Sequence, residues 1–335
     1  MEYRTLGSSG LRVSVAGLGC NNLGGRIDLA ATKAVVAAAL NAGITFFDTA
    51  CICGDGKSEE FLGQALGSRR KDVVIATKFG MERDDPESGG SRRYVMSAVE
   101  TSLKALGTDW IDLYQLHQSD PRTPIEETLD ALDTLVDQGN ARYAGCSNCM
   151  GWQIADAQWT AIQHGFRRFV SAQNQWGLLH RDIETEVVPE CVRFGIGVLP
   201  YFPLASGFLT GKVRRGQKPP LDSRLSAAQF ATLLTDSNFD TLDRLEAWGR
   251  AHGRSLLGIA LAWLASQPVV SPVIAGATKP EQLRANVDAT TTDFGGGEIH
   301  ELGELVGFWP PTCHPEATEG KRRSGLAAHL SRSRV

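Results

Sequence analysis

Ionisable side chains end three apolar runs of this sequence, and together they could form a proton-transfer site. Asp48 ends ITFFD, Lys78 ends VVIATK and His117 ends DLYQLH. A lysine next to apolar residues pays a desolvation penalty unless a carboxylate lies nearby, so Asp48 is its expected partner. Such a pair tunes the proton affinity of a neighbouring acid. His117 could then donate a hydrogen bond to a substrate oxygen.

Further polar residues also follow apolar runs, namely Ser147 with Asn148, Gln173 with Gln175, and Tyr201. Any one of them could simply cap the next helix or pair with a neighbour. In a barrel of alternating strands and helices, however, the strand ends share one face, so residues distant in sequence converge there. Six such positions together favour a functional site over six coincidences.

The elements that must position these residues repeat in a regular order. Short β-branched runs alternate with longer amphipathic segments, which is typical of a parallel α/β fold. The expected strands are residues 13–18, 44–48, 73–78, 111–117, 141–147, 169–175, 198–201 and 270–276. The expected helices are residues 29–41, 58–66, 91–106, 125–138, 152–164, 184–194, 255–265 and 280–288.

Eight strands, each followed by a helix, predict a closed barrel. Right-handed crossovers can close eight parallel strands, whereas a doubly wound sheet usually carries a G-x-G-x-x-G turn after its first strand. Here the first strand leads into GLGCNNLGG, which lacks that spacing. We therefore predict a (β/α)8 TIM barrel over residues 1–309, with an N-terminal β-hairpin.

Two segments fall outside this regular order. Residues 213–243 are polar and contain Pro219-Pro220, which predicts a long loop after the seventh strand, with a short helix, over one barrel mouth. Residues 310–335 carry five Lys or Arg after Gly320 and no strong periodicity, so we expect a flexible basic tail.

The composition excludes several classes of protein. A net charge of −4 over 335 residues gives no overall basic field, so nucleic acid is not expected as a partner. No run approaches about twenty apolar residues and the N-terminus does not resemble a signal peptide, so we expect a cytoplasmic protein without a membrane span. Seven cysteines, an odd and sparse set, indicate reduced thiols. No heptad or exposed apolar stripe indicates an oligomeric state.

One segment matches a specific motif. FFDTACICGDGKSEEFLGQAL, residues 46–66, resembles the signature of the aldo-keto reductase family, in which D-T-A is followed after two residues by Tyr-Gly and then by Ser-Glu-x-x-Leu-Gly. The similarity continues in order through IATKFG, DLYQLH, GCSN, AQNQWGLL, LPYFPLASGFLTGK and VIAGATKPEQLRANV. It covers about residues 2–290, and seven ordered motifs leave little room for coincidence.

The resemblance implies a barrel that holds NADPH in an extended pose. Ser147, Asn148 and Gln173 would bind the carboxamide, and Tyr201 would stack on the nicotinamide. The pyrophosphate would lie along residues 203–212 and the adenosine end along residues 276–286. The full set of implied cofactor-binding residues is Gly19, Cys20, Asn21, Asp48, Ser147, Asn148, Gln173, Tyr201, Pro203, Leu204, Ser206, Gly207, Leu209, Lys212, Gly276, Thr278, Lys279, Gln282 and Asn286.

The adenosine end also decides between the two nicotinamide cofactors. GATKPEQL predicts a helix start with Pro280 in the first turn, whose free amides favour an anionic group. In many members of the family, Lys or Arg side chains hold the 2′-phosphate at this point. Here Lys279 is the available charge, whereas Gln282 stands where arginine often does. We expect NADPH ahead of NADH.

The sequence departs from the family at Cys53, where the resemblance places the catalytic tyrosine. In the family, hydride moves from the nicotinamide to a carbonyl carbon while the tyrosine hydroxyl protonates the oxygen, helped by the lysine and the aspartate. The implied catalytic set is therefore Asp48, Cys53, Lys78 and His117. A thiol is shorter than a phenol, and beside Lys78 its pKa of about 8.5 is expected to fall, leaving a thiolate without a proton.

We therefore predict an NADPH-dependent oxidoreductase that reduces aldehydes or ketones to alcohols, with activity impaired at Cys53. Loss of a placed general acid costs about 10²–10⁴ in rate, of which a water or His117 could recover part. The alternative is an NADPH-binding regulatory or sensor protein with little reductase activity, as the potassium-channel β subunits of this family partly are. The sequence leaves open whether Cys53 is native or was introduced into a parent that carried tyrosine.

The cysteines allow two further hypotheses. Cys51, Cys53, Cys146 and Cys149 could bind zinc, although the C-x-C spacing and the overlap with the cofactor site argue against a metal. A Cys53 thiolate could instead sense oxidants beside the nicotinamide. Buried, inert thiols are the simplest interpretation, and no metal is expected.

Loops after the strands build the substrate pocket of such barrels. We expect Asn21, Trp110 or its neighbours, Trp176 and the loop after Val213 to line it. The aromatic residues in this set favour an apolar or aromatic carbonyl compound.

Overall fold

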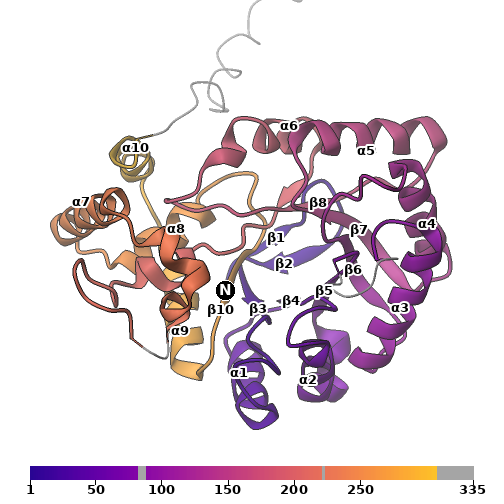
Figure 1. Ribbon diagram of the computed structural model, residues 1–335, viewed down its shortest axis with the longest axis horizontal. Helices are drawn as coiled ribbons and strands as arrows, with labels where there is room; N and C mark the ends of the chain where they lie inside the picture. The colour runs from indigo at the N-terminus through magenta and orange to yellow at the C-terminus, as the bar shows by residue number, and fades with distance from the viewer. Residues whose placement is uncertain (82–87, 221–222, 308–335) are drawn as a thin grey trace, which may run out of the picture.

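The central sheet of the computed structural model, which describes residues 1–81, 88–220 and 223–307, has eight parallel strands in the order β10–β3–β4–β5–β6–β7–β8–β9 (Figure 1). Their bounds are β3 Ala16–Gly19, β4 Phe46–Asp48, β5 Val74–Phe79, β6 Ile111–Leu116, β7 Ala141–Ser147, β8 Ser171–Gln173, β9 Gly197–Val198 and β10 Val273–Gly276. The outer strands also join, because Ile274 N donates to Pro200 O at 3.3 Å and Val198 pairs with Val270. The sheet closes on itself, and the predicted (β/α)8 barrel is confirmed.

A two-stranded hairpin covers the amino-terminal end of the barrel. β1 Tyr3–Thr5 pairs antiparallel with β2 Arg12–Ser14, and Ser8 N in its turn donates to Gly195 O at 2.7 Å, just before β9. Leu6 and Val13 are fully buried and pack against the side chains that fill the barrel interior, namely Phe46, Val74, Ala76, Leu113, Leu199 and Ile274. The hairpin was expected, but the single strand predicted over residues 13–18 is wrong, because the chain leaves the hairpin before β3 begins.

Eight helices follow the barrel strands as predicted, within three residues at each end. They are α1 Leu29–Asn41, α2 Lys57–Leu66, α3 Arg92–Leu106, α4 Ile125–Asp137, α5 Gly151–His164, α6 Val187–Phe194, α8 Leu256–Ala265 and α9 Pro280–Thr290. Capping side chains stabilise the amino-terminal ends of three of these helices: Asp28 accepts from Ala31 N, Ser91 from Tyr94 N and Ser255 from Gly258 N. These bonds satisfy amides that have no partner within the helix.

Short 3-10 turns complete the described elements. They are η1 Gly67–Asp72, η2 Asp182–Glu184, η3 Ala205–Thr210, η4 Arg224–Ser226 and η5 Ala228–Leu233. Of these, η3 to η5 lie in the connection that follows β9, and η2 precedes α6.

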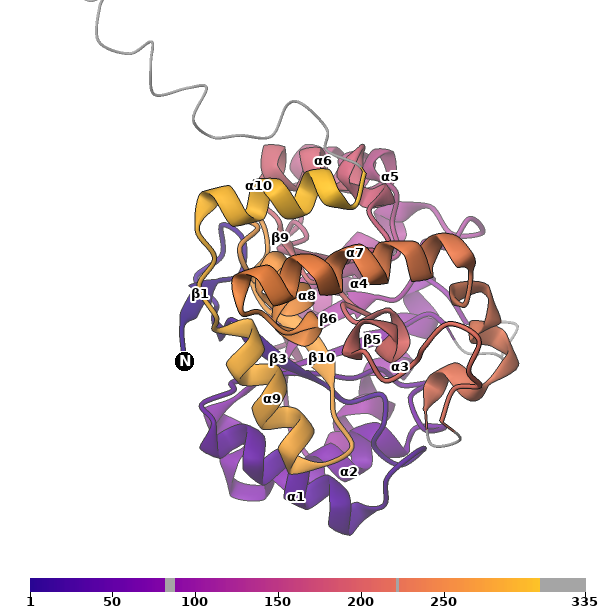
Figure 2. The ribbon, with the colours of Figure 1, turned by 90° about the vertical axis from the view of Figure 1, so that its left-hand side faces the viewer.

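Two helices were not predicted as separate elements. α7 Asp236–His252 begins inside the segment predicted as a loop over residues 213–243, and α10 Gly296–Leu305 follows α9. Figure 2 shows α7 lying over α8, with α10 next to it. Trp248 Nε1 of α7 donates to Glu301 Oε2 of α10 at 2.9 Å. α8 is buried on all sides because α7 covers the face that an ordinary barrel helix exposes. The predicted basic tail over residues 310–335 lies outside the described residues.

Within the described ranges, no helix is long and apolar enough to cross a membrane.

A buried ion pair ties the β8–α6 connection to its surroundings. Arg181 and Glu184 form two hydrogen bonds of 2.7 Å, and their side chains are 6% and 5% exposed. Glu184 also accepts from Trp176 Nε1 at 2.9 Å, and Arg181 donates to Gly303 O of α10 at 3.2 Å. The pair therefore joins η2 to α10, and the Arg181 guanidinium lies 5.1 Å from the Trp263 ring of α8.

We expect Glu184→Gln to lower the free energy of unfolding by about 3 kcal/mol, because it leaves the Arg181 charge buried without its carboxylate. Replacing both residues, as Arg181→Met with Glu184→Leu, should recover most of that loss. Chemical denaturation measures both changes. Asp182→Asn, at a side chain that is 88% exposed, is the control and should change little. Equal stability of Glu184→Gln and the wild type would contradict a structural role for the pair.

Candidate functional site

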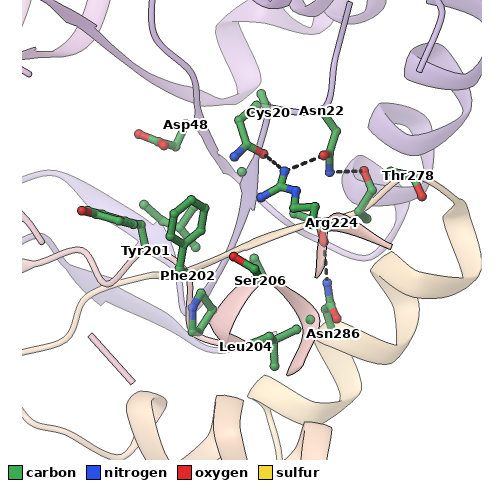
Figure 3. Close-up of a pocket in the computed structure, with 18 of the residues that line it drawn as sticks. Cys20, Asn22, Asp48, Tyr201, Phe202, Leu204, Ser206, Arg224, Thr278 and Asn286 are labelled. Carbon is green, nitrogen blue, oxygen red and sulfur yellow. Dashed lines mark hydrogen bonds between the residues drawn. The ribbon is translucent and has the colours of Figure 1, made fainter. Parts of the chain in front are cut away.

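A cavity of about 680 Å³ opens at the carboxyl ends of the strands. This volume lies within the range of small-molecule and cofactor sites. Figure 3 shows Asp48 and Tyr201 towards one end of the cavity and Thr278 and Asn286 towards the other, with Arg224 between them. Of the catalytic and cofactor-binding residues expected from the sequence, all but one line this cavity, as β3 to β10 bring their ends together. The exception is Leu209, whose side chain is 1% exposed in the surrounding core.

The strongest interaction in the cavity is the ion pair between β4 and β5. Lys78 Nζ donates to Asp48 Oδ1 at 2.7 Å and to Thr49 O at 2.7 Å, and Gln173 Nε2 donates to the same Asp48 oxygen at 2.8 Å. Lys78 is 3% exposed and Asp48 is 8% exposed. The pairing predicted from the sequence is present, and together with the bond to Thr49 O it accounts for two of the three ammonium hydrogens.

Part of the D-T-A…S-E motif anchors this pair through hydrogen bonds. Thr49 Oγ1 and Ser58 Oγ are hydrogen-bonded at 2.8 Å, and Ser58 Oγ donates to Cys20 O at 2.8 Å. Glu59 accepts from Thr77 Oγ1 at 2.5 Å. The start of α2 is thereby fastened to the ends of β3, β4 and β5, which holds Lys78 and Asp48 at a fixed separation.

His117 is a neutral imidazole in this setting. Burial, together with the positive charge of Lys78, lowers the pKa of His117 to about 3. Its Nδ1 is buried and has no hydrogen-bond partner among the described residues. A neutral imidazole next to an ammonium can orient a substrate oxygen but is a poor source of protons near pH 7. The sequence-based suggestion that His117 supplies the missing proton is therefore not supported.

The thiol of Cys53 departs from expectation. Its pKa is raised, because burial opposes the thiolate more strongly than the Lys78 charge favours it, and Asp48 and Glu59 add to the effect. The prediction of a lowered pKa was wrong, since it counted the lysine and neglected burial. Cys53 is a protonated thiol at neutral pH, which also argues against a thiolate that senses oxidants.

The five other cysteines that the structure describes form no metal site. The described part of the chain contains no group of three or more His, Cys, Asp or Glu placed to hold a metal ion. Cys146 and Cys149 are buried, and the pKa of Cys146 is raised well above its usual range by its hydrogen bond to Cys149 and by burial. The zinc hypothesis is contradicted, and inert thiols are the better description.

A polar chain links the residues expected around a nicotinamide. Tyr201 Oη donates to Asn148 Oδ1 at 2.7 Å, and Asn148 Nδ2 donates to His117 O at 3.0 Å. Ser147 Oγ donates to Gln173 O at 2.9 Å. Asn148 has a φ of 55°, a left-handed conformation that asparagine tolerates better than most residues. The ends of β6, β7 and β8 are thus cross-linked at the cavity.

The far half of the cavity has the properties of an anion site. Ala205, Ser206 and Gly207 have φ values of 45°, 58° and 100° in succession and form a tight turn at the cavity, in which the amides of Ala205 and Gly207 donate to Phe202 O and Leu204 O at 2.9 Å. The start of α9 contributes backbone amides next to the Lys279 ammonium. The start of α9 and the Lys279 charge suit an anionic group.

Sequence reasoning missed Arg224, the cation nearest the middle of the cavity. Its Nη2 donates to Asn21 Oδ1 at 2.8 Å and to Asn22 Oδ1 at 2.6 Å. Burial, together with the nearby Arg26 charge, lowers the pKa of Arg224. Residues 213–243 carry no periodic pattern that would point an arginine inward, so only its tertiary position identifies it (Figure 3).

The two tryptophans expected to line the substrate pocket, Trp110 and Trp176, do not line the cavity. Trp110 precedes β6, at the opposite end of the barrel, and lies between the guanidinium groups of Arg70 and Arg142 at 4.7 and 5.8 Å. Trp176 is 2% exposed and packs edge-on against Trp263. Asn21 lines the cavity as expected, and so do Pro220, Ser223 and Arg224 of the loop after Val213. Met81 and Phe202 also line it and were not expected.

Known proteins are similar to this chain over most of its length. Residues 16–306 match the Aldo/keto reductase family. A protein from Oryza sativa subsp. japonica named as a probable voltage-gated potassium channel subunit beta is 37% identical over 86% of this chain and 91% of its own. A probable aldo-keto reductase 1 from Glycine max is 35% identical over 90% of this chain and 88% of its own. Versiconal hemiacetal acetate reductase from Aspergillus parasiticus is 33% identical, over 94% and 99% of the two chains.

Protonation of His117 should cost stability in acid. The unfolded chain binds a proton at this residue below about pH 6.5, whereas the folded chain does not until about pH 3. Above about pH 6.5 the residue is neutral in both states and does not affect the free energy of unfolding. As the pH falls from about 6.5 to about 3, proton binding by the unfolded chain lowers the free energy of unfolding. His117→Asn should reduce the drop in Tm between about pH 7 and about pH 4.

His300→Asn, at an exposed histidine of α10, serves as the control for this series. Carbon-13 NMR of the imidazole provides a direct check, since His117 should stay neutral at about pH 5. A His117 that titrates at its ordinary pKa would overturn this assignment.

Proposed function

The chain belongs to the aldo/keto reductase family, and we propose that it reduces aldehydes or ketones to alcohols with a nicotinamide cofactor, at a rate limited by the thiol at position 53. The observation that carries this proposal is the buried Lys78–Asp48 pair, with neutral His117 beside it, in a cavity that also holds an anion site. These are the parts that a carbonyl reductase of this family needs apart from its phenol.

A bound nicotinamide nucleotide supplies the hydride in this chemistry. Ser147, Asn148 and Gln173 would fix its carboxamide, and the ring of Tyr201 would support its flat face. The Arg224 guanidinium, together with the turn at Ser206 and Gly207 that lines the same cavity, would meet the pyrophosphate. Lys279, which lines the same cavity, would pair with a 2′-phosphate, and we therefore infer NADPH ahead of NADH.

The chain's own groups then polarise the carbonyl oxygen. Neutral His117 would donate a hydrogen bond to this oxygen, and the remaining N–H of Lys78 adds positive potential. Cys53 keeps its proton, but its side chain ends at Sγ and is much shorter than a phenol. The proton must therefore reach the oxygen without a rigid donor in contact with it, which costs rate.

A second candidate is a cofactor-binding regulator with little reductase activity. Two observations favour it: Cys53 stands where the family has its proton donor, and the relatives include proteins named as potassium-channel β subunits. Both candidates require the same cofactor site, so turnover is what separates them.

Cys53→Tyr should raise the rate of carbonyl reduction at least about a hundredfold, because it restores a general acid next to Lys78. Oxidation of NADPH in the presence of aromatic aldehydes and diketones measures the gain. Cys53→Ser and Cys51→Tyr are the matched controls, and neither should improve turnover. If wild type and Cys53→Tyr turn over equally, another group delivers the proton. If neither turns over while NADPH still binds, the regulatory candidate is favoured.

Arg224→Ala should weaken the binding of both NADPH and NADH about tenfold or more, because a charged hydrogen bond contributes about 1.5–3 kcal/mol. Lys279→Ala should weaken NADPH alone. Quenching of tryptophan fluorescence reports the dissociation constants. Lys218→Ala is the control, since this exposed lysine lies in the same connection but does not line the cavity. Unchanged affinity in Arg224→Ala would contradict the proposed pyrophosphate site.

A further inference from the structure

Among the described residues, one N–H of Lys78 lacks a hydrogen-bond acceptor. The ammonium donates to Asp48 Oδ1 and to Thr49 O, each at 2.7 Å, and residues 1–81, 88–220 and 223–307 supply no third acceptor. Lys78 is 3% exposed and lines the cavity. A buried charged donor without a partner costs free energy, so the cavity favours a ligand that places an oxygen atom at Lys78.

A second group that can hold a ligand oxygen lies near this N–H. Burial, together with the Lys78 charge, lowers the pKa of His117 to about 3, and both side chains line the same cavity. A carbonyl oxygen bound by His117, as proposed above, therefore stands near Lys78. It still needs a proton, because the neutral imidazole is a poor source of one. Lys78 cannot lose its own proton without leaving Asp48 buried as an unpaired charge.

Cys53 borders the space next to these two groups. Its thiol is free, its side chain ends at Sγ, and it lines the same cavity of about 680 Å³. Burial raises the pKa of Cys53 more strongly than the Lys78 charge lowers it, so the thiol keeps its proton. A thiol is also a weak hydrogen-bond donor. The space in front of Sγ is therefore open to a proton donor that enters with the ligand, within reach of Lys78.

We propose that the substrate supplies its own proton: it is a 2-hydroxyaryl aldehyde or ketone, whose hydroxyl binds Lys78 beside Cys53 and protonates the neighbouring carbonyl oxygen. This inference rests on the proposed reductase function and names its substrate class. A hydroxyl on the ring carbon next to the carbonyl group lies within hydrogen-bond distance of the carbonyl oxygen. It can accept from Lys78 and donate to that oxygen at the same time, because a hydroxyl has both kinds of site.

A phenolic hydroxyl suits this position better than an aliphatic one. The phenol of tyrosine has a pKa of about 10, close to the value of about 10.4 for a lysine ammonium, whereas an aliphatic alcohol is a far weaker acid. The positive charge of Lys78 favours the phenolate and so eases loss of the proton. Met81 and Phe202, which line the cavity, can pack against an aromatic ring.

Atoms and electrons balance in this step. The carbonyl carbon gains a hydrogen with its electron pair from the reduced nicotinamide, and the π electrons of the C=O bond move to the oxygen. That oxygen takes the proton of the neighbouring hydroxyl, which becomes a phenolate hydrogen-bonded to Lys78. The phenolate then takes a proton from water. In sum, the carbonyl compound, the reduced nicotinamide and one proton give the alcohol and the oxidised nicotinamide.

The preference for 2-hydroxybenzaldehyde over 2-methoxybenzaldehyde tests the inference on the full chain with NADPH, because the methyl ether lacks the proton. The ratio of their kcat/KM values should be at least about tenfold higher in the wild type than in Cys53→Tyr, whose added phenol serves both aldehydes. The ratio for the 4-hydroxy and 4-methoxy isomers, whose substituents cannot reach the carbonyl oxygen, should be the same in both proteins. Cys51→Tyr, at a residue that does not line the cavity, should keep the wild-type ratios.

The gain of about a hundredfold expected of Cys53→Tyr then applies to carbonyl compounds without such a hydroxyl.

A phenol with a visible phenolate tests the Lys78 site without cofactor or turnover. 4-Nitrophenol should ionise more readily when bound, because the Lys78 charge favours its phenolate. Its yellow absorbance should therefore rise when protein is added at a pH where the free phenol is mostly protonated. Lys78→Met should abolish the rise, and Cys53→Tyr should reduce it by filling the space. Lys218→Met, at an exposed lysine away from the cavity, should leave it unchanged.

The outcomes separate this inference from the proposed function. If Cys53→Tyr reduces the aldehydes and the wild type shows the same 2-hydroxy to 2-methoxy ratio, the inference is wrong and the reductase function stands. If no variant reduces any aldehyde while NADPH binds, the reductase function fails and the substrate class fails with it. A wild type that produces no absorbance rise with 4-nitrophenol, or a rise that persists in both Lys78→Met and Cys53→Tyr, would overturn the hydroxyl site itself.

Discussion

Burial of an ammonium beside a carboxylate at the barrel mouth constrains everything around it. An isolated charge at a site as enclosed as that of Lys78 costs several kcal/mol, so Asp48 must stand within hydrogen-bond distance. This requires β4 and β5 to be neighbours in a fixed register, in which Asp48 lies opposite Ala76. The same cost explains why the Thr49 carbonyl accepts a hydrogen bond from Lys78 and the Gln173 amide donates one to Asp48. The same positive charge helps to keep His117 neutral.

The D-T-A…S-E motif around this pair contains residues of two kinds. Ser58 and Glu59 bind backbone and side-chain groups of the neighbouring strands and hold α2 in place. Cys53, five residues before Ser58, lines the cavity instead. A different residue at position 53 would therefore change the lining of the cavity without disturbing the hydrogen bonds of Ser58 and Glu59 that hold α2 in place.

The order of elements could be predicted because it depends on local pattern. The α1 and β7 segments match their predicted bounds, since a helical or strand-like apolar period and a capping residue such as Asp28 are written in consecutive residues. α7 was largely missed because its sequence is mostly polar and shows no clear helical period. It packs over α8, which is apolar on every side, so the burial of α7 depends on its partner. The division between β2 and β3 likewise depends on which distant strand each segment meets.

The sequence by itself determined the barrel, the convergence of Asp48, Lys78 and His117, and the substitution at position 53, because these follow from periodicity and from the rule that parallel strands end on one face. Only the tertiary structure decided that the pKa of Cys53 is raised, that Arg224 reaches the cavity, that Trp110 lies at the wrong end of the barrel, and that the tryptophans of α5 face outward. Burial and charge act through space and sum over residues that are remote in sequence, so no stretch of consecutive residues contains them.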